Sequence, residues 1–329
     1  MEARLHGPPA IAAVGLAPHA MRRQRLGDTL FRGLTRAFAV GVLVLLGAVV
    51  LSLAAGAMPA FRKFGLDFLV SEAWNPVKDT FGALPAIYGT VLTALIAMLL
   101  AVPVAIGIAI FLTELCPPLM RRPIGMLVEL LAAIPSIIYG VWGLFVVAPV
   151  LQTTLQPFLI DTLGNVPVLG ALFQGPPYGL GVLTAGLILA VMVLPFIAAV
   201  TRDVFLTVPA MLRESAYGMG ATTAEVVRSI VIPHSRVGIV GGVMLGLGRA
   251  LGETMAVTFV IGNAHHIRAS LLAPGTTISA TLANEFTEAV SDIYTSSQIA
   301  LGLILFVITF IVLAIANFML WRLSTKEGA

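Results

Sequence analysis

Charged residues are scarce in this sequence: they make up 11% of its 329 residues, whereas 58% are hydrophobic. A soluble globular domain carries about 25% charged residues, so the composition excludes that class. The sequence also lacks a long polar segment, which leaves no room for a second, soluble domain. Several apolar stretches exceed the roughly 18 residues that span a bilayer. We therefore expect an all-α polytopic membrane protein.

Two further absences narrow the chemistry. Cys116 is the single cysteine, so an intrachain disulfide is excluded. The three lysines follow Arg62, Val77 and Thr325, so the phosphate-binding pattern G-x-x-x-x-G-K-[ST] does not occur and ATP cannot be bound by that route. The basic residues are scattered near span ends, which indicates membrane topology and not nucleic acid binding.

Six apolar stretches have the length of membrane spans. We expect the spans at about 37–57, 87–112, 124–150, 178–200, 237–262 and 298–321. The small residues at Ala55–Ala57 also resemble a signal-peptide cleavage site, but the long apolar run and basic leader favour an uncleaved first helix. Pro103, Pro135 and Pro195 lie within spans and predict a kinked bundle.

The distribution of arginine and lysine predicts the orientation. Fourteen of these residues lie in the N-terminal arm, the two connections around 113–123 and 201–236, and the tail, against four on the other side. Basic residues mark the cytoplasmic face, so both termini are expected in the cytoplasm. The predicted organisation is a cytoplasmic arm over residues 1–36 and a transmembrane permease domain over 37–329.

The connection between the fourth and fifth spans carries the clearest local signals. Pro209 suits the first turn of a helix, and Gly220 suits the left-handed position just past a helix end. Thr222 and Glu225 have the spacing of a capping box for a second helix, and Pro233 is expected to stop that helix before span five. The segment thus predicts two short helices joined at a glycine corner, a shape suited to docking; the alternative is a plain connecting loop.

This connection resembles the cytoplasmic loop of type I ABC importer permeases, whose pattern is E-A-A-x3-G-x9-I-x-L-P. The matching residues here are Glu214, Ser215, Ala216, Gly220, Ile230, Ile232 and Pro233, with Ser for the first Ala and Ile for Leu. The resemblance implies that the loop seats in an ATPase subunit and passes on its movement.

Three further stretches resemble the permease subunits of phosphate importers within this family: 74–97, 121–149 and 245–263. The "GETMAVTFVIGN" form of the fifth span favours one of the two permease types over its sister, PstA. The resemblance implies import of inorganic phosphate along a path shared with a PstA-like permease. It also implies a PstB-like ATPase dimer that uses ATP and magnesium, and a PstS-like phosphate-binding protein outside, with 58–86 and 263–297 as candidate contacts. No cofactor is expected in this chain.

Two charged residues lie deep in the predicted fifth span. Arg249 is at its midpoint, about 18 Å from either end, and Glu253 is one helical turn away. Charges at this depth are costly, and ionisable residues inside a membrane are functional by default. A guanidinium also matches phosphate geometry. We predict that Arg249 lines the substrate path with Glu253 as its counter-ion; the alternative is a pair that only locks span five to its neighbours.

Weaker candidates have plainer explanations. Glu129 is expected to snorkel or to pair with Arg121 or Arg122, and the loop residues His265 and His266 are expected to be solvated rather than metal-bound. The stretch 276–290 predicts a short amphipathic surface helix, and Ser136 and Tyr139 suit packing as well as the path.

The glycines of the fifth span predict close helix packing. Gly238, Gly242 and Gly246 recur at four-residue steps, a spacing that lets two helices approach closely. They are expected to face another span, either of this chain or of a partner permease.

Three other functions stay open on the residues alone. A secondary transporter would need ionisable sites in several spans and often internal repeats. A membrane scaffold for phosphate-responsive signalling is a second alternative. The third is a permease for another oxyanion, because an arginine alone does not distinguish phosphate from sulfate.

Overall fold

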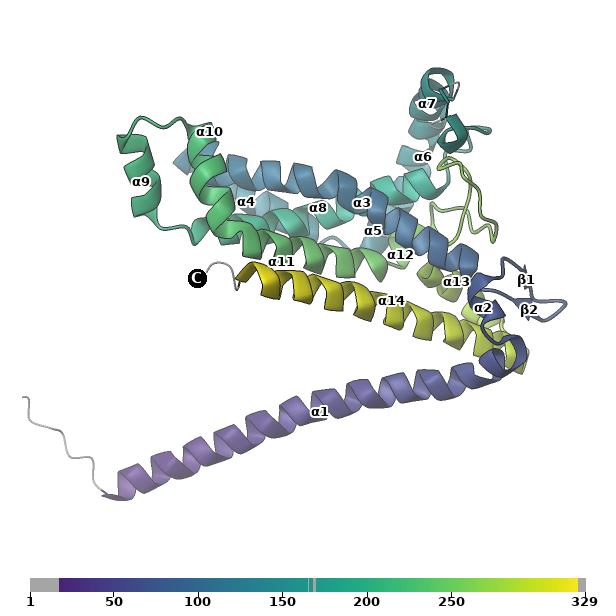
Figure 1. Cartoon of the computed structure of the whole chain (residues 1–329), viewed down its shortest axis with the longest axis horizontal. Helices are drawn as coiled ribbons and strands as arrows, with labels where there is room; N and C mark the ends of the chain where they lie inside the picture. The colour runs from purple at the N-terminus through teal and green to yellow at the C-terminus, as the bar shows by residue number, and fades with distance from the viewer. Residues whose placement is uncertain (1–17, 165, 168–169, 325–329) are drawn as a thin grey trace, which may run out of the picture. The chain divides into compact units, whose positions relative to one another are not determined.

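The computed structural model describes residues 18–164, 166–167 and 170–324 (Figure 1). The chain divides into two compact units, Met1–Ser52 and Leu53–Ala329. Within the described residues, six helical runs have the length and apolarity of membrane spans: Asp28–Phe64, Leu84–Leu115, Ser136–Leu163, Val182–Leu206, Thr223–Leu251 and Asp292–Arg322. The expected all-α membrane architecture with six spans is confirmed.

The first helix and the outer connection come before the second span. Helix α1 covers Pro18–Phe64, so helical structure starts before the predicted span; the basic residue Arg4 lies outside the described residues. The short helix α2 (Asp67–Val70) and an antiparallel hairpin follow, in which Trp74 of β1 (Trp74–Asn75) faces Phe81 of β2 (Thr80–Phe81).

The remaining elements complete the bundle. In chain order they are α3 (Leu84–Ile110), η1 (Phe111–Leu115), α4 (Pro118–Ala132), α5 (Ser136–Trp142), η2 (Gly143–Val147), α6 (Ala148–Val150), η3 (Leu151–Leu155), α7 (Gln156–Leu163), η4 (Gly170–Leu172), α8 (Val182–Leu206), α9 (Ala210–Gly218), α10 (Thr223–Val226), η5 (Val227–Val231), α11 (Ile232–Leu251), α12 (Met255–Thr258), α13 (Ile278–Glu285), η6 (Phe286–Glu288) and α14 (Asp292–Ser324).

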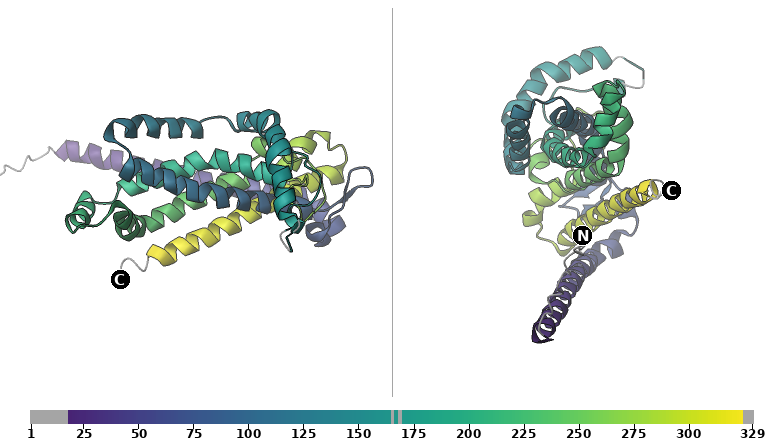
Figure 2. Two further views of the ribbon diagram at one scale, coloured as in Figure 1. Left: turned by 90° about the horizontal axis from the view of Figure 1, so that it is seen from above. Right: turned by 90° about the vertical axis from the view of Figure 1, so that its left-hand side faces the viewer.

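Helix α8 occupies the centre of the second unit and is buried along most of its length. It packs against α3, α4 and α11, which run beside it in both views (Figures 1 and 2). Small residues allow this approach: a Cβ on Gly186 of α8 would lie 2.6 Å from the Ile96 side chain of α3. The largest apolar core lies among α3, α5, α8, α11 and α12.

The glycine stripe of the fifth span packs inside this chain. A Cβ on Gly238 would meet Val204, one on Gly242 would meet Val200, and one on Gly246 would come within 2.6 Å of Ile197. All three neighbours belong to α8. The predicted close packing is therefore confirmed, and its partner is the fourth span.

Prolines explain the irregular turns of these helices. Proline lacks an N–H group and its ring clashes with the carbonyl one turn back, and a wider π-helical turn relieves both problems. Each of the four π-helical segments η1, η2, η3 and η5 ends two residues before a proline. The prolines are Pro117, Pro149, Pro157 and Pro233.

The expectation that Pro233 would stop the second helix is therefore wrong. Helical structure runs without a gap from Thr223 to Leu251, because the π-helical turn η5 accommodates the proline. Pro103 and Pro195 likewise lie inside the continuous helices α3 and α8.

Pro135 does break the third predicted span, so the expected single helix over 124–150 is wrong. Helix α4 ends at Ala132 and α5 starts at Ser136. The missing N–H of Pro135 leaves the Leu131 carbonyl without its helical partner, and the Tyr139 hydroxyl donates to that oxygen at 2.8 Å. Tyr139 is buried and its hydroxyl is used in this bond, which favours packing over a place in the path.

Candidate functional site

The corner, residues 207–233, lies at the end of the second unit opposite the β1–β2 hairpin (Figure 1). Pro209 directly precedes the first helical residue of α9, which places it one position before the expected first turn. Gly220 follows the end of α9 with φ of +88°, as predicted. The Gly220 N–H donates to the Tyr217 carbonyl, and the Ala221 N–H donates to the Ala216 carbonyl. These two bonds satisfy carbonyl groups at the end of α9.

The second helix of the corner starts as its sequence predicts. The Thr222 side chain accepts from the Glu225 N–H, and the Glu225 carboxylate accepts from the Thr222 N–H at 2.8 Å. Both halves of the capping box are present. The direction of the chain is therefore fixed on both sides of Gly220.

The motif residues divide into a buried and an exposed group. Ala216 is buried in an apolar cluster with Phe205 and Val226, against which Ile230 and Ile232 pack. Glu214, Ser215, Gly220 and Pro233 are exposed. The first group attaches the corner to the bundle, and the second is available for contact.

Two exposed methionines extend the outward surface of α9. Met211 is 75% exposed and Met219 is 84% exposed. Large apolar residues at this exposure suit a contact surface. Sequence reasoning missed them, although a methionine at each end of this short charged segment is the signal that was available.

An ion pair connects the corner to the second span, and sequence reasoning missed it too. Arg213 of α9 lies 3.4 Å from the carboxylate of Glu114, whose side chain is only 5% exposed. The geometry is electrostatic contact without a hydrogen bond, since that Glu114 oxygen has no hydrogen-bond partner. Arg213 also donates to the Phe205 carbonyl, four residues before Pro209.

The fifth span breaks at the predicted charged pair. Helix α11 ends at Leu251, and α12 begins at Met255. The continuous helical turn expected between Arg249 and Glu253 is therefore wrong: glycine at 252 ends the helix between them. Within the described residues these two side chains form no ion pair; instead, Glu253 accepts from the Ala256 N–H at 3.2 Å.

Arg249 is left exposed on the surface of the chain, in the last turn of α11. It makes no hydrogen bond within the described residues. At 1.5 Å per residue, Arg249 lies about 24 Å along the helix from Pro233 in the corner, which places it deep in the span. Non-helical backbone at membrane depth is tolerated only where protein buries it or where it lines a water-filled space. The break and the exposed guanidinium thus mark one candidate site.

A polar cluster joins the outer connections, and the expectation of solvated histidines is wrong for His265. Its ring stacks on Trp74 at 4.8 Å, and Nε2 lies 2.8 Å from the Glu285 carboxylate. Trp74 and Tyr294 each donate to that carboxylate at 2.7 Å. Burial alone would raise the pKa of Glu285, but the hydrogen bonds from His265, Tyr294 and Trp74 outweigh it and lower the pKa below its ordinary value.

Two other expectations are corrected. Glu129 pairs with Arg202 at 2.7 Å, not with Arg121 or Arg122. The stretch 276–290 does form a helix, α13, but its first residues, from Ile278 to Thr281, are buried rather than on the surface. Thr90 of α3 accepts from the Ile278 N–H, which ties this helix into the bundle.

The family model for the inner membrane component of binding-protein-dependent transport systems matches residues 82–324. The chain belongs to this family. The match covers the corner, the broken fifth span and α13, and it makes the chain a membrane component of such a transport system.

Members of this family with high identity carry a more specific name. The chain is 66% identical over 309 residues to the phosphate transport system permease protein PstC of Mesorhizobium japonicum, covering 94% of each chain. It is 55% identical to the PstC of Pasteurella multocida, covering 92% of this chain and 94% of the other. A probable PstC of Methanocaldococcus jannaschii is 38% identical over 81% of this chain and 85% of the other.

Solved structures of ABC transporters share the family's fold. A chain of a bacterial transporter that imports the acidic polysaccharide alginate matches with a TM-score of 0.57 and 19% identity, over 91% of this chain and 99% of the other. A chain of the MetNI methionine transporter in an inward-facing form matches with a TM-score of 0.53 and 16% identity, over 72% and 94%. At these identities the likeness supports the architecture alone.

Proposed function

We propose that this chain is the transmembrane permease subunit of an ATP-driven importer of inorganic phosphate and forms half of the path with a PstA-like permease. The observation that carries the proposal is the 66% identity, over 94% of both chains, to a phosphate transport system permease protein. The chain itself catalyses no reaction and holds no cofactor in this proposal; ATP and magnesium are used by a PstB-like ATPase dimer.

The corner supplies the ATPase contact in this proposal. The exposed residues Met211 and Glu214 of α9 and Met219 just after it seat in the ATPase, and the cluster under Ala216 carries the displacement of α9 into the bundle. The hollow beside α9, about 720 Å³ and lined by Leu212, Ile230 and Pro233 among others, adds contact area. Both termini lie on this cytoplasmic side of the inner membrane.

Arg249 supplies the substrate contact. A guanidinium donates paired hydrogen bonds to phosphate oxygens, and Arg249 has no other acceptor within the described residues to compete for it. Glu253 has its own backbone contact at Ala256, so we propose that it fixes the break and meets Arg249 only when the path rearranges. The outer segments 58–86 and 263–297 receive the PstS-like binding protein.

Replacing Arg249 by Gln tests the path. In proteoliposomes that contain the whole complex, uptake of labelled phosphate is expected to fall at least tenfold, a loss of about 1.4 kcal/mol, while the complex still co-purifies. Arg36→Gln is the control, because Arg36 is exposed in α1 and makes no bond within the described residues. Normal uptake by Arg249→Gln would remove the transport role.

The alternatives separate in the same preparation. Competition by sulfate as strong as by unlabelled phosphate indicates a general oxyanion permease. Uptake that proceeds without the ATPase indicates a secondary transporter. Phosphate-dependent repression that persists in a transport-dead Arg249→Gln strain indicates a separate scaffold role in signalling.

A further inference from the structure

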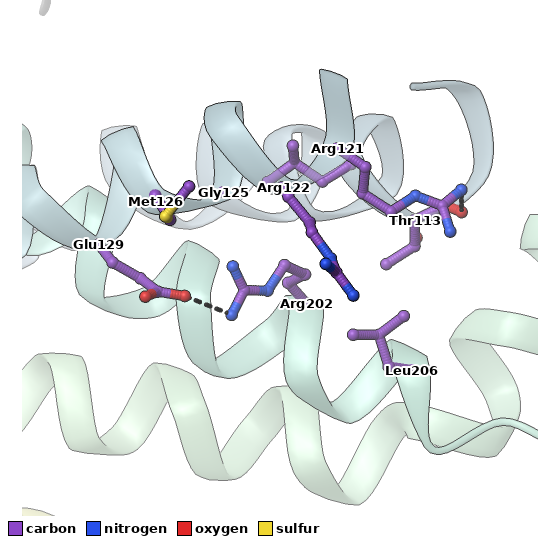
Figure 3. A pocket seen from close by; sticks show the side chains of 9 residues that line it. Thr113, Arg121, Arg122, Gly125, Met126, Glu129, Arg202 and Leu206 are labelled. Carbon is purple, nitrogen blue, oxygen red and sulfur yellow. Dashed lines mark hydrogen bonds and ion pairs between the residues drawn. The ribbon is translucent and has the colours of Figure 1, made fainter. Parts of the chain in front are cut away.

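A pocket with three arginines lies between α4, the end of α8 and η1, and its lining includes neither Arg249 nor a residue of the corner (Figure 3). Its volume is about 330 Å³. Arg121 and Arg122 come from the first turns of α4, and Arg202 comes from the last turns of α8. Apolar side chains of Leu112, Met126 and Leu206 complete the walls.

Two of the three positive charges in this pocket, Arg121 and Arg122, have no counter-ion within the described residues. Arg202 binds two carboxylates, Glu129 and Asp203, each at 2.7 Å. Arg122 is exposed and makes no hydrogen bond or ion pair with any described residue. Figure 3 shows its side chain extending from α4 toward Arg202 and Leu206. The carboxylates of Glu129 and Asp203 compensate Arg202, so the charge left over in the pocket is that of Arg121 and Arg122, which an anion would neutralise.

The other two arginines are held in place for such an anion. Arg121 donates to the Thr113 carbonyl at 2.8 Å, while its buried Nε has no partner in the described residues. Thr113 is four residues before Pro117, so this carbonyl is the one that the proline leaves without a helical N–H. Gly125 gives Arg202 its room, since a Cβ there would lie 2.9 Å from the guanidinium.

The surroundings of the pocket favour a lipid over a free ion. On both sides of Arg122 along the chain, helix α4 exposes apolar side chains: Leu119 is 89%, Leu127 is 61% and Leu130 is 63% exposed. A free phosphate ion gains nothing from that surface, whereas acyl chains cover it. Charge placement in the sequence puts Arg121 and Arg122 at the cytoplasmic leaflet, where anionic lipids and basic pockets between spans meet.

We infer that this pocket binds the phosphodiester headgroup of an anionic phospholipid, with the acyl chains along α4. Arg122 is the main contact with the phosphate, and Arg121 contributes the surrounding positive potential, while Arg202 stays bound to its two carboxylates. The site is separate from Arg249, which lies on α11, so it does not depend on the identity of the transported substrate.

The test uses the whole complex in nanodiscs or detergent and measures retention of phosphatidylglycerol by native mass spectrometry. Arg122→Gln is expected to lower retention about fivefold, the factor for losing one arginine at an anionic surface. Arg122→Lys is expected to keep part of the binding, because it preserves the charge but not the paired donors. The control Arg36→Gln removes one exposed positive charge elsewhere and is expected to leave retention unchanged.

Two results would overturn the inference. One is equal retention of phosphatidylglycerol by the native complex and by Arg122→Gln, which would also be the outcome if a partner chain covers the pocket. The other is displacement of the lipid by inorganic phosphate at millimolar concentration, which would make the pocket a free-phosphate site. A failed phosphate uptake assay bears on Arg249 and leaves this measurement unaffected.

Discussion

At the scale of single residues, Glu285 shows how one carboxylate joins three separate parts of the chain. It accepts from Trp74 of the β1–β2 hairpin and from Tyr294 of α14, and it contacts His265 of the intervening loop. Gln298 adds a longer bond at 3.3 Å. Charge-assisted bonds of this kind are stronger than neutral ones, so the ionised form of Glu285 holds the outer end together.

The lowered pKa of Glu285 predicts an acid-sensitive outer end. A carboxyl group whose pKa falls on folding stabilises the protein above its ordinary pKa of about 4.3, and that stability is lost as the pH drops through the lowered value. We expect the unfolding temperature to fall steeply below about pH 4 in the native protein. The Glu285→Gln variant is expected to have a lower unfolding temperature at pH 7, and this temperature is expected to change less with pH. Thermal unfolding in detergent measures both.

Glu288→Gln is the matched control for this prediction. Glu288 belongs to the same segment but is exposed and makes no hydrogen bond within the described residues. Its replacement should leave the pH profile unchanged. A profile of Glu285→Gln as steep as that of the native protein would contradict the role of this carboxylate.

At the scale of elements, hydropathy and local signals predicted much of the bundle. The number of spans, the corner with Gly220 and the capping box at Thr222 all follow from short-range chemistry. The breaks do not. Pro135 and Pro233 are the same residue type in apolar runs, yet the first ends a helix and the second is absorbed by a π-helical turn. The difference lies in neighbouring contacts, which a single sequence does not contain.

The candidate site was predictable in composition but not in geometry. Arg249 and Glu253 were visible as charges in an apolar run, but the i,i+4 spacing implied a continuous helix that ends at Leu251. Gly252 lies between them and ends the helix, a role that glycine commonly has just past a helix end. The pairs Glu129–Arg202 and Glu114–Arg213 join residues far apart in sequence, so no local pattern indicated them.

Two glycines of α11, one in the stripe and one outside it, are expected to respond to alanine with opposite signs. Gly246→Ala would bring a Cβ within 2.6 Å of Ile197, whereas nothing lies within 4 Å of a Cβ on Gly241. We expect Gly241→Ala to stabilise the protein by up to about 1 kcal/mol through helix propensity. Gly246→Ala is expected to cost about 1–3 kcal/mol by overpacking α11 on α8.

Thermal unfolding of both alanine variants and of Gly242→Ala checks this contrast. The Cβ of Gly242→Ala would lie 3.0 Å from Val200, so an intermediate effect is expected. Equal stability of Gly241→Ala and Gly246→Ala would mean that the two helices separate easily, against the close packing described above.

At the scale of the whole molecule, the proposed ATPase contact and the proposed substrate contact lie on one continuous helical run. It extends over the 29 residues from Thr223 in the corner to Leu251 beside Arg249. At 1.5 Å per residue, this run is about 42 Å long. Because this run is continuous, we expect a displacement of the corner to move the broken end as well.

The Glu114–Arg213 ion pair gives this mechanical connection a second attachment, to the end of the second span. Removing one partner of a buried pair leaves an unpaired charge and costs about 3–5 kcal/mol, whereas removing both costs less. We therefore expect Glu114→Gln and Arg213→Gln each to lower thermal stability more than Glu114→Gln/Arg213→Gln does. Arg213 also holds the Phe205 carbonyl, so Glu114→Gln isolates the ion pair better.

Transport should separate from assembly in the double variant. The apolar cluster under Ala216 is unchanged there, so the ATPase is expected to co-purify, while phosphate imported per ATP hydrolysed falls because α9 is no longer attached to the second span. The exposed pair Asp28–Arg32 is the matched control, since both side chains are more than 70% exposed and such pairs contribute about 0.3–0.5 kcal/mol. The contrary result is that Glu114→Gln/Arg213→Gln imports as much phosphate per ATP hydrolysed as the control with Asp28 and Arg32 replaced. In that case, the corner transmits its movement only through the apolar cluster and the helical run from α10 to α11.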